Sequence, residues 1–267
     1  MALIAWHAIR RRRAGLLWWS VGLIGVVTLL VVAYPTVRDN AELDRTFADL
    51  PPGVEQLLGL GGGNTLTSPA GYLNSQFFAN VLPVMLLVFA VGMAAWTIAG
   101  DETAGTLELL LANPVGQVRV ALARFGGLIV ASAGLVAVSS AALVALAGPT
   151  GLDQGLPSIR LVQATVASGL LALTFAAVAF AIGAATGNRP AALAGAAGLA
   201  VAGYLVEGLA PQVNALRSLR AVDPWHWLID TDPLRHGLTW QTWLPSVIAT
   251  TALVAVSLPV LARRDIN

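Results

Sequence analysis

Residues 77–119 read FFANVLPVMLLVFAVGMAAWTIAGDETAGTLELLLANPVGQVR and change character in the middle. The first part, 77–99, holds no charged residue. It is long enough to cross a hydrocarbon core of about 30 Å, for which a helix needs roughly 20 apolar residues. Asp101 and Glu102 then interrupt the apolar run, and a short leucine-rich segment precedes the next long apolar stretch. This order predicts a short helix between two membrane-crossing helices, where a soluble partner can act.

The composition of the whole chain fits this interpretation. Of its 267 residues, 57% are hydrophobic and 11% are charged, whereas charged residues make up about a quarter of a soluble domain. The mean hydropathy is +0.75. We therefore predict an all-α integral membrane protein. The net charge of +1 gives no indication of a nucleic-acid partner.

Two residue types are missing from the sequence, and each absence excludes a group of activities. All 15 basic residues are arginine, so a P-loop lysine, a Schiff-base lysine and a lysine general base are excluded. The chain therefore cannot hydrolyse ATP by a Walker mechanism. The absence of cysteine excludes disulfides, thiol catalysis and cysteine-ligated metal sites. His7, His226 and His236 lie outside the predicted spans, so we predict no enzyme activity.

Six segments are apolar enough to cross a bilayer when they are delimited by charged or proline-rich borders. We place them at 15–34, 77–99, 120–147, 161–185, 191–210 and 242–262. They form one transmembrane domain over residues 1–267, with long outer loops at 35–76 and 211–241. The third segment is long, which indicates a tilt. The fifth is rich in alanine and glycine, which let helices approach closely.

The arginines predict the orientation. Nine of the fifteen fall on one side of the predicted spans, which leaves six on the other, and the arginine-rich side is expected to be cytoplasmic. The nine are Arg10 to Arg13, Arg119, Arg124, Arg189, Arg263 and Arg264. Both termini are then cytoplasmic. Residues 1–13 are either an amphipathic helix in the inner interface or a plain positive-inside anchor before the first span.

Glu207 is the acidic residue that falls inside a predicted span. A carboxylate at membrane depth is costly and often marks a cavity or an ion pathway, so Glu207 is a candidate cavity or interface residue. It lies near the outer end of its helix. An interfacial position, with Arg217 or Arg220 as its partner, is therefore an equal alternative.

The outer loops contain two further patterns. Residues 221–240, AVDPWHWLIDTDPLRHGLTW, hold tryptophans that are typical of a belt at headgroup level. The metal-binding side chains of this stretch are His226, Asp230, Asp232 and His236. Their spacing matches no ligand signature, and loop capping by aspartate before proline explains the pattern better, so we predict no metal site. The run GLGGGN at 59–64 follows no strand and is predicted to be a flexible link.

The segment after the second span has start and stop signals of its own. Gly105 permits a break, Thr106 can cap a new helix, and Glu108 suits the positive end of the helix dipole. The pair Asn113-Pro114 stops the helix. We therefore predict a short helix at 106–113.

One face of this short helix is apolar. Leu107, Leu110 and Leu111 share it, at the spacing that brings side chains together on a helix. The residues alone leave two interpretations open. The leucines either dip into the membrane interface or dock against a soluble partner.

The same segment resembles the cytoplasmic signature of ABC-2-type transporter permeases. The resemblance is strongest to the six-span branch that includes the permease of nitrous-oxide-reductase maturation. The matching residues are Glu102, Gly105, Thr106, Leu107, Glu108, Leu110, Leu111 and Pro114. The family's arginine three residues after the proline is replaced by Gln117. GYLNSQFF at 71–78 and DPWHW at 223–227 also resemble this branch.

The resemblance implies a permease half that dimerises, with itself or with a related permease, and sits on two separate ATPase subunits. Each ATPase would grip the helix at 106–113, which makes the matching residues an ATPase-coupling contact. ATP and Mg²⁺ would bind those subunits, and this chain would need no cofactor. The implied activity is export of an amphipathic cargo, such as a drug, lipid or peptide. A lysine-free, alanine-rich composition favours a GC-rich bacterium and its cytoplasmic membrane.

Two functions of other classes compete with this one. An ion-gradient-driven transporter would use Glu207 as its titrating group and would be built from inverted repeats, of which the sequence shows no clear sign. A non-transporting scaffold would hold partners on its outer loops. Dependence on ATP separates the exporter from both.

Overall fold

The structure is a computed structural model, and it describes residues 13–40, 54, 65–103 and 117–263. In these parts the chain is helical and contains no strand. Six helices are long and apolar enough to cross a membrane, which confirms the predicted all-α class and the predicted number of spans. The predicted coupling helix at 106–113 lies outside the described residues, as do residues 1–12. The orientation of the termini stays a prediction.

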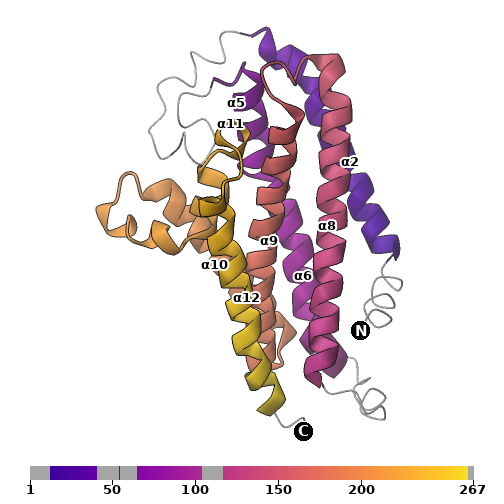
Figure 1. Cartoon of the computed structure of the whole chain (residues 1–267), viewed down its shortest axis with the longest axis vertical. Helices are drawn as coiled ribbons and strands as arrows, with labels where there is room; N and C mark the ends of the chain where they lie inside the picture. Colours follow the sequence, from indigo (N-terminus) through magenta and orange to yellow (C-terminus); the bar gives the residue numbers. More distant parts are fainter. Residues whose placement is uncertain (1–12, 41–53, 55–64, 104–116, 264–267) are drawn as a thin grey trace.

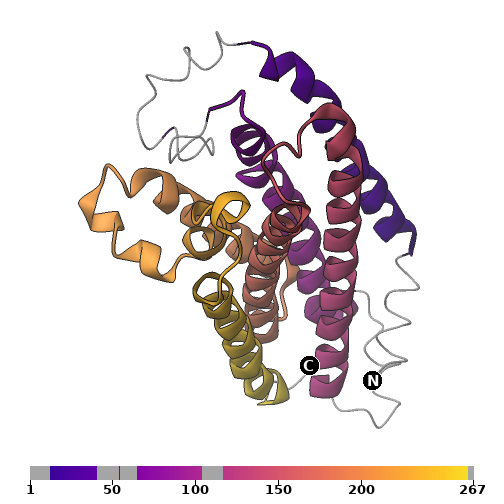
Figure 2. The ribbon, with the colours of Figure 1, turned by 45° about the horizontal axis from the view of Figure 1, so that its top comes forward.

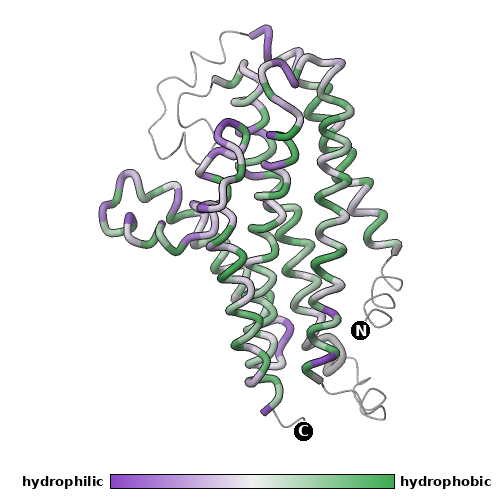
Figure 3. Tube along the Cα trace, viewed as in Figure 1, coloured by the Kyte–Doolittle hydropathy of each residue, from purple (hydrophilic) through white to green (hydrophobic). Residues whose placement is uncertain are grey.

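The six long helices stand side by side as an elongated bundle (Figure 1). They are α2 (Arg13–Arg38), α6 (Val81–Thr103), α8 (Gln117–Thr150), α9 (Ser158–Thr186), α10 (Arg189–Leu209) and α12 (Trp240–Arg263). Apolar residues run along most of their length (Figure 3). Several helices extend past the predicted boundaries, because the polar residues at their ends continue the helix beyond the apolar core.

Helix α9 is the centre of the bundle. It packs against α6, α8, α10 and α12. In its most apolar stretch 67% of the residues are buried, compared with 17% in the corresponding stretches of α2 and α12. Small side chains allow this packing, since a Cβ at Gly169 would lie 2.6 Å from Cγ2 of Val136 on α8. Helices α2 and α12 are therefore peripheral, and their outward apolar faces suit lipid.

The second span starts farther out than predicted and is not one regular helix. Helices α5 (Pro69–Leu73) and η1 (Asn74–Phe78) precede α6, and the apolar span covers Pro69–Thr97. Ser68 caps α5 by accepting the amide of Gly71 at 3.1 Å, and Pro69 occupies the first helical turn. Helix η1 is a π-helix, a conformation that no sequence signal announced.

Between α10 and α12 the chain forms a segment of short helices, which we call the outer segment after its predicted side of the membrane. These are η2 (Asn214–Leu216), η3 (Leu219–Val222), η4 (His226–Asp230) and α11 (Pro233–His236). The part directly after α10 projects sideways from the bundle, as two views show (Figures 1 and 2). The later part returns to the bundle, where η4 packs against α9 and α12.

At the opposite end of the bundle, α6 and α8 are joined by a polar contact. Nη1 of Arg124 donates to the carbonyl of Thr97 at 2.9 Å, and the guanidinium lies 6.0 Å from the centroid of the Trp96 ring. This contact lies close to where residues 104–116 leave α6 and enter α8. It holds together the two helices that flank the predicted coupling helix.

Candidate functional site

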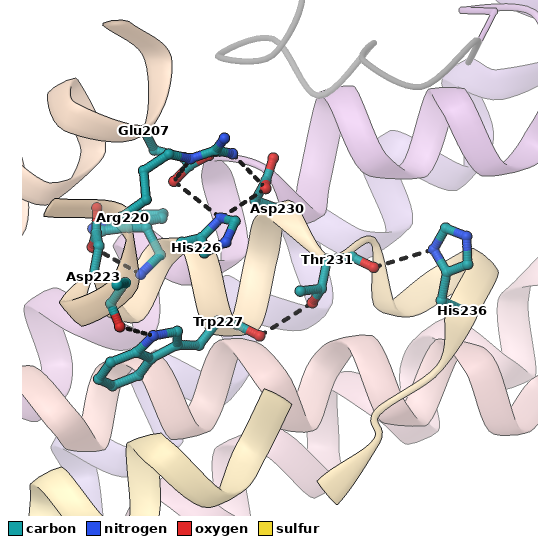
Figure 4. A network of polar contacts seen from close by, with 10 residues as sticks. Glu207, Arg220, Asp223, His226, Trp227, Asp230, Thr231 and His236 are labelled. Carbon is teal, nitrogen blue, oxygen red and sulfur yellow. Dashed lines mark hydrogen bonds and ion pairs between the residues drawn. The ribbon is translucent and has the colours of Figure 1, made fainter. Parts of the chain in front are cut away.

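Five ionisable side chains gather where α10 ends and the outer segment returns to the bundle (Figure 4). They are Glu207, Arg220, Asp223, His226 and Asp230, and we call them the outer cluster. Glu207 lies in the last turn of α10, and Arg220 lies on η3. His226 and Asp230 are four residues apart on η4 and face each other. The cluster therefore joins three elements of the chain.

Arg220 is the centre of the outer cluster. Its Nη2 contacts Oε1 of Glu207, its Nε donates to Oε2 of Glu207 at 3.2 Å, and Nη2 also donates to Oδ2 of Asp230 at 2.8 Å. The side chain of Glu207 is 9% exposed and that of Arg220 is 25% exposed. A planar guanidinium suits such a two-point contact with a carboxylate. One cation thus links two carboxylates from different elements.

His226 is the second cation of the outer cluster. Its Nδ1 lies 2.9 Å from Oδ2 of Asp230 and 3.4 Å from Oε2 of Glu207. Neither oxygen is aligned with the ring N–H, so the contacts are ion pairs more than directed hydrogen bonds. The carboxylates of Asp230 and, next, Glu207 raise the pKa of His226 to about 9. His226 is therefore protonated near neutral pH, and two cations balance Glu207 and Asp230.

Asp223 is the buried acid of the outer cluster. It is 5% exposed, and its Oδ1 accepts the backbone N–H of Trp225 at 3.0 Å, as aspartate does before a turn. Its Oδ2 has no hydrogen-bond partner in the described part of the chain. Burial raises the pKa of Asp223 to about 6. Asp223 thus changes its charge over mildly acidic pH values.

The four side chains of residues 221–240 that could in principle bind a metal do not converge on one point. His226 and Asp230 meet in the outer cluster, whereas Asp232 caps α11 and His236 lies 3.2 Å from the carbonyl of Thr231. Ligand atoms of Glu207, His226 and Asp230 do lie within 4.8 Å of one another. However, Arg220 already occupies the carboxylate oxygens, and a dication would have to displace it. We interpret the group as an ion-pair cluster.

Three uncharged contacts extend the outer cluster towards the second span. The indole N–H of Trp225 donates to the carbonyl of Ala200 on α10 at 2.9 Å. The rings of Trp225 and Tyr204 meet edge to face with centroids 5.3 Å apart. The hydroxyl of Tyr204 donates to Oδ1 of Asn80 at 2.6 Å. Tyr204 and Asn80 were missed from the sequence, although a polar side chain inside a predicted span, such as Asn80 in 77–99, is a usable signal.

The residues predicted to couple to an ATPase fall in a different region. Gly105, Thr106, Leu107, Glu108, Leu110, Leu111 and Pro114 all lie outside the described residues. The backbone of Glu102 belongs to the last turn of α6. The structure therefore describes the two helices that flank the coupling segment, and the role of the segment stays a prediction. Glu207 is paired with Arg220, one of the two partners expected for an interfacial position.

Comparison with known proteins gives a family assignment for nearly the whole chain. A family model described as ABC-2 family transporter protein matches residues 2–266. No curated protein matches the sequence. The match includes all six spans and the outer segment, and it therefore concerns the architecture as a whole.

Proposed function

The chain belongs to the ABC-2 family of transporter proteins, and from this membership we propose that it is the permease subunit of an ATP-driven exporter. The family assigns it a role as a membrane transport permease. The finer parts of the proposal are its ATPase partners, its dimeric state and the direction of transport. The observation that carries the proposal is a family match over residues 2–266 in a chain with six membrane-length helices.

The energy for transport must come from a partner in this proposal. The chain has no lysine, and a Walker P-loop needs one. Separate ATPase subunits would therefore bind ATP and Mg²⁺, and they would grip residues 106–113 on the cytoplasmic side. The contact between Arg124 and Thr97 supports this proposal. It joins α6 to α8, so a force applied by the ATPase to the segment between them would move both helices together.

Two permease copies would enclose the pathway in this proposal. In a single copy, only 28% of the residues in the most apolar stretch of α10 are buried. The surface of this helix carries small residues that let helices approach closely. The cargo would be amphipathic, such as a drug, lipid or peptide, because the spans offer apolar side chains and a few hydroxyls. The membrane would be the bacterial cytoplasmic membrane, with both termini inside the cell.

The outer cluster would form the outer closure of each permease half. Glu207 lies in the last turn of α10, and η4, which carries His226 and Asp230, packs against α9 and α12. Ion pairs between them hold the outer ends of these helices together. Opening the outer side requires these pairs to separate, and charged pairs that separate into water regain their hydration. The cluster can therefore open and close at moderate cost.

The ion-driven transporter is less favoured by the same geometry. A titrating carboxylate for ion coupling has to be accessible from a pathway and free to change its charge. Glu207 instead contacts Arg220 through both oxygens. It also lies in the last turn of its helix, away from the membrane midplane where such sites are found.

Purification from the native membrane tests the proposal. The tagged chain is extracted in mild detergent, bound proteins are identified by mass spectrometry, and ATP hydrolysis is measured on the eluate. We expect a stoichiometric soluble subunit with a P-loop, lost when Leu107 and Glu108 are replaced together. A matched control replaces the exposed outer residue Asp153. A chain that purifies alone, without ATPase activity, would contradict the exporter proposal.

A further inference from the structure

The second span contains a junction that is suited to bending. Helix η1 is a π-helix, in which the amide of Ala79 bonds to the carbonyl of Asn74 at 2.7 Å. Asn80 lies between η1 and the start of α6 and belongs to neither helix. Short π-helical turns are often found at functional sites, and hinges are formed by a few residues at the ends of elements. Asn80 occupies such a position.

The side chain of Asn80 is held by α10. The hydroxyl of Tyr204 donates to Oδ1 of Asn80 at 2.6 Å, which is a short bond for this pair of groups. Tyr204 precedes Glu207 by three residues, so the two side chains lie on neighbouring positions of one helix face. The same face of α10 thus contacts the junction of the second span and the outer cluster.

The ring of Tyr204 also contacts the outer segment. Trp225 is 4% exposed and packs on Tyr204 edge to face. Its backbone N–H donates to Asp223, the buried acid of the outer cluster. Gly203 makes this approach possible, because a Cβ there would lie 2.7 Å from Oδ1 of Asp223 and 3.0 Å from Cδ1 of Trp225. The contacts from Asn80 to Asp223 are therefore continuous.

We infer that Tyr204 is a positioning residue that ties the junction of the second span at Asn80 to the outer cluster. Helix α6 runs from this junction to Thr103, where residues 104–116 begin. A tilt of α6 moves Asn80, and the bond to Tyr204 passes this movement to the face of α10 that carries Glu207. The inference rests on the proposed function for the idea that movement passes from α6 to the outer cluster. The linkage between Asn80 and the outer cluster can be tested without that function.

A reporter of the outer cluster is available because the chain has no cysteine. Ala210 follows α10 directly and is 0% exposed, three residues beyond Glu207. An Ala210→Cys thiol is the single thiol of the permease, and a membrane-impermeant maleimide reaches it only when the outer end of α10 opens. The rate of labelling, measured on the permease alone in nanodiscs, reports that opening.

The first experiment is a double-mutant cycle on this labelling rate. Tyr204→Phe removes one hydroxyl, and Glu207→Gln weakens the outer cluster. The matched control is Tyr72→Phe, which removes a similar hydroxyl bond, 2.9 Å long, from Tyr72 to the carbonyl of Leu30 on α2. We expect Tyr204→Phe and Glu207→Gln each to raise the rate by about fivefold.

The combination of variants decides between linkage and simple loosening. If Tyr204 acts through the outer cluster, Tyr204→Phe adds less than about twofold to a variant that already carries Glu207→Gln. Asn80→Ala, which removes the acceptor, has the same result. Tyr72→Phe changes the rate by the same factor in both backgrounds. If the double variant has a labelling rate raised by the product of the two single-variant factors, Tyr204 and the outer cluster act independently and the inference is wrong.

The second experiment adds the ATPase subunits and nucleotide. We expect ATP to change the labelling rate of Ala210→Cys in the assembled complex, and Tyr204→Phe to reduce that change by about fivefold, whereas Tyr72→Phe preserves it. A full response in Tyr204→Phe would overturn the inference and leave the exporter standing. A complex that forms no ATPase contact would contradict the exporter alone, since the cycle on the isolated permease still decides the linkage.

Discussion

At the scale of single residues, Arg220 shows how a charged group is tolerated beside an apolar span. Its guanidinium contacts Glu207 and Asp230, and all three side chains keep some exposure to solvent. Removing one member of a buried pair costs more than the pair itself contributes, because the remaining charge loses its partner. The partial exposure of Arg220 reduces that cost.

Glu207→Gln is expected to lower stability for this reason. We predict a loss of about 2 kcal/mol, seen as a fall of roughly 5 °C in the thermal midpoint of the detergent-solubilised protein. The control is Asp39→Asn, which removes the carboxylate of an exposed pair with Arg38 and is expected to change stability by less than about 0.5 kcal/mol. Equal shifts for both variants would mean that the outer cluster adds nothing to stability.

His226 predicts a dependence of stability on pH. Its folded-state pKa of about 9 lies above the ordinary value of 6.5, so the folded state holds the proton more tightly than the unfolded state. The stabilisation is complete below about pH 6.5 and is lost as the pH rises through about 9. The raised pKa of Asp223 acts in the same direction between about pH 4 and 6.

The corresponding measurement is the thermal midpoint between pH 6.5 and 9.5. We expect it to fall with rising pH in the wild-type protein and to be nearly flat in His226→Gln. The matched control is His236→Gln, which removes an imidazole that lies against the carbonyl of Thr231, and it should keep the wild-type slope. A wild-type curve without an alkaline decline would contradict the ion pairs of His226.

At the scale of elements, the contact between α8 and α9 depends on the absence of a side chain. A Cβ at Gly169 would lie 2.6 Å from Cγ2 of Val136, and a branched side chain in a packed interface has little room to move. We predict that Gly169→Ala lowers the free energy of unfolding by about 1–3 kcal/mol. Gly134→Ala on α8, where nothing lies within 4 Å, should be neutral or slightly stabilising. Thermal unfolding of both variants measures the difference.

The elements that the sequence predicted are those with a strong periodic or compositional signal. Long apolar runs predicted six spans, and six membrane-length helices are found. The π-helices η1 and η4 were not predicted, because a π-turn inserts one residue and leaves no characteristic pattern. The extension of the second span to Pro69 was also missed. Ser68 and Pro69 begin a helix, but polar residues follow them, so the apolar run used to place the span starts later.

The outer cluster could be predicted only in part. Glu207 was recognised from its cost in a membrane, and Arg220 was one of two partners considered. Asp223 and Asp230 could not be assigned, because their positions depend on the path of η3 and η4 after α10, which local propensity does not determine. Tyr204 and Asn80 are 124 positions apart, and a single sequence gives no signal for such a distant pair.

At the scale of the whole molecule, function is expected to depend on the segment between α6 and α8, which we propose to be cytoplasmic. We predict that Glu108→Lys abolishes most ATP-dependent export, because it reverses a charge at the start of the proposed coupling helix. Membrane insertion and thermal stability should be unchanged. Transport into inverted vesicles, with immunodetection of the inserted chain, measures both quantities. Arg119→Gln, an exposed change on α8, is the control, and unchanged export in Glu108→Lys would remove the segment from the mechanism.

The π-helix η1 has a consequence for how this chain can vary in length. A π-turn contains one residue more than an α-turn, so deleting one residue from Asn74–Phe78 would let the second span close into a continuous α-helix without breaking it. The parts of the span on either side of the deletion would then keep nearly the same relative orientation, whereas a deletion from a regular α-helix rotates one side by about 100°. Tyr72 would keep facing Leu30 and Tyr204 would keep Asn80, so this span can lose one codon at η1 without changing the direction of its side chains.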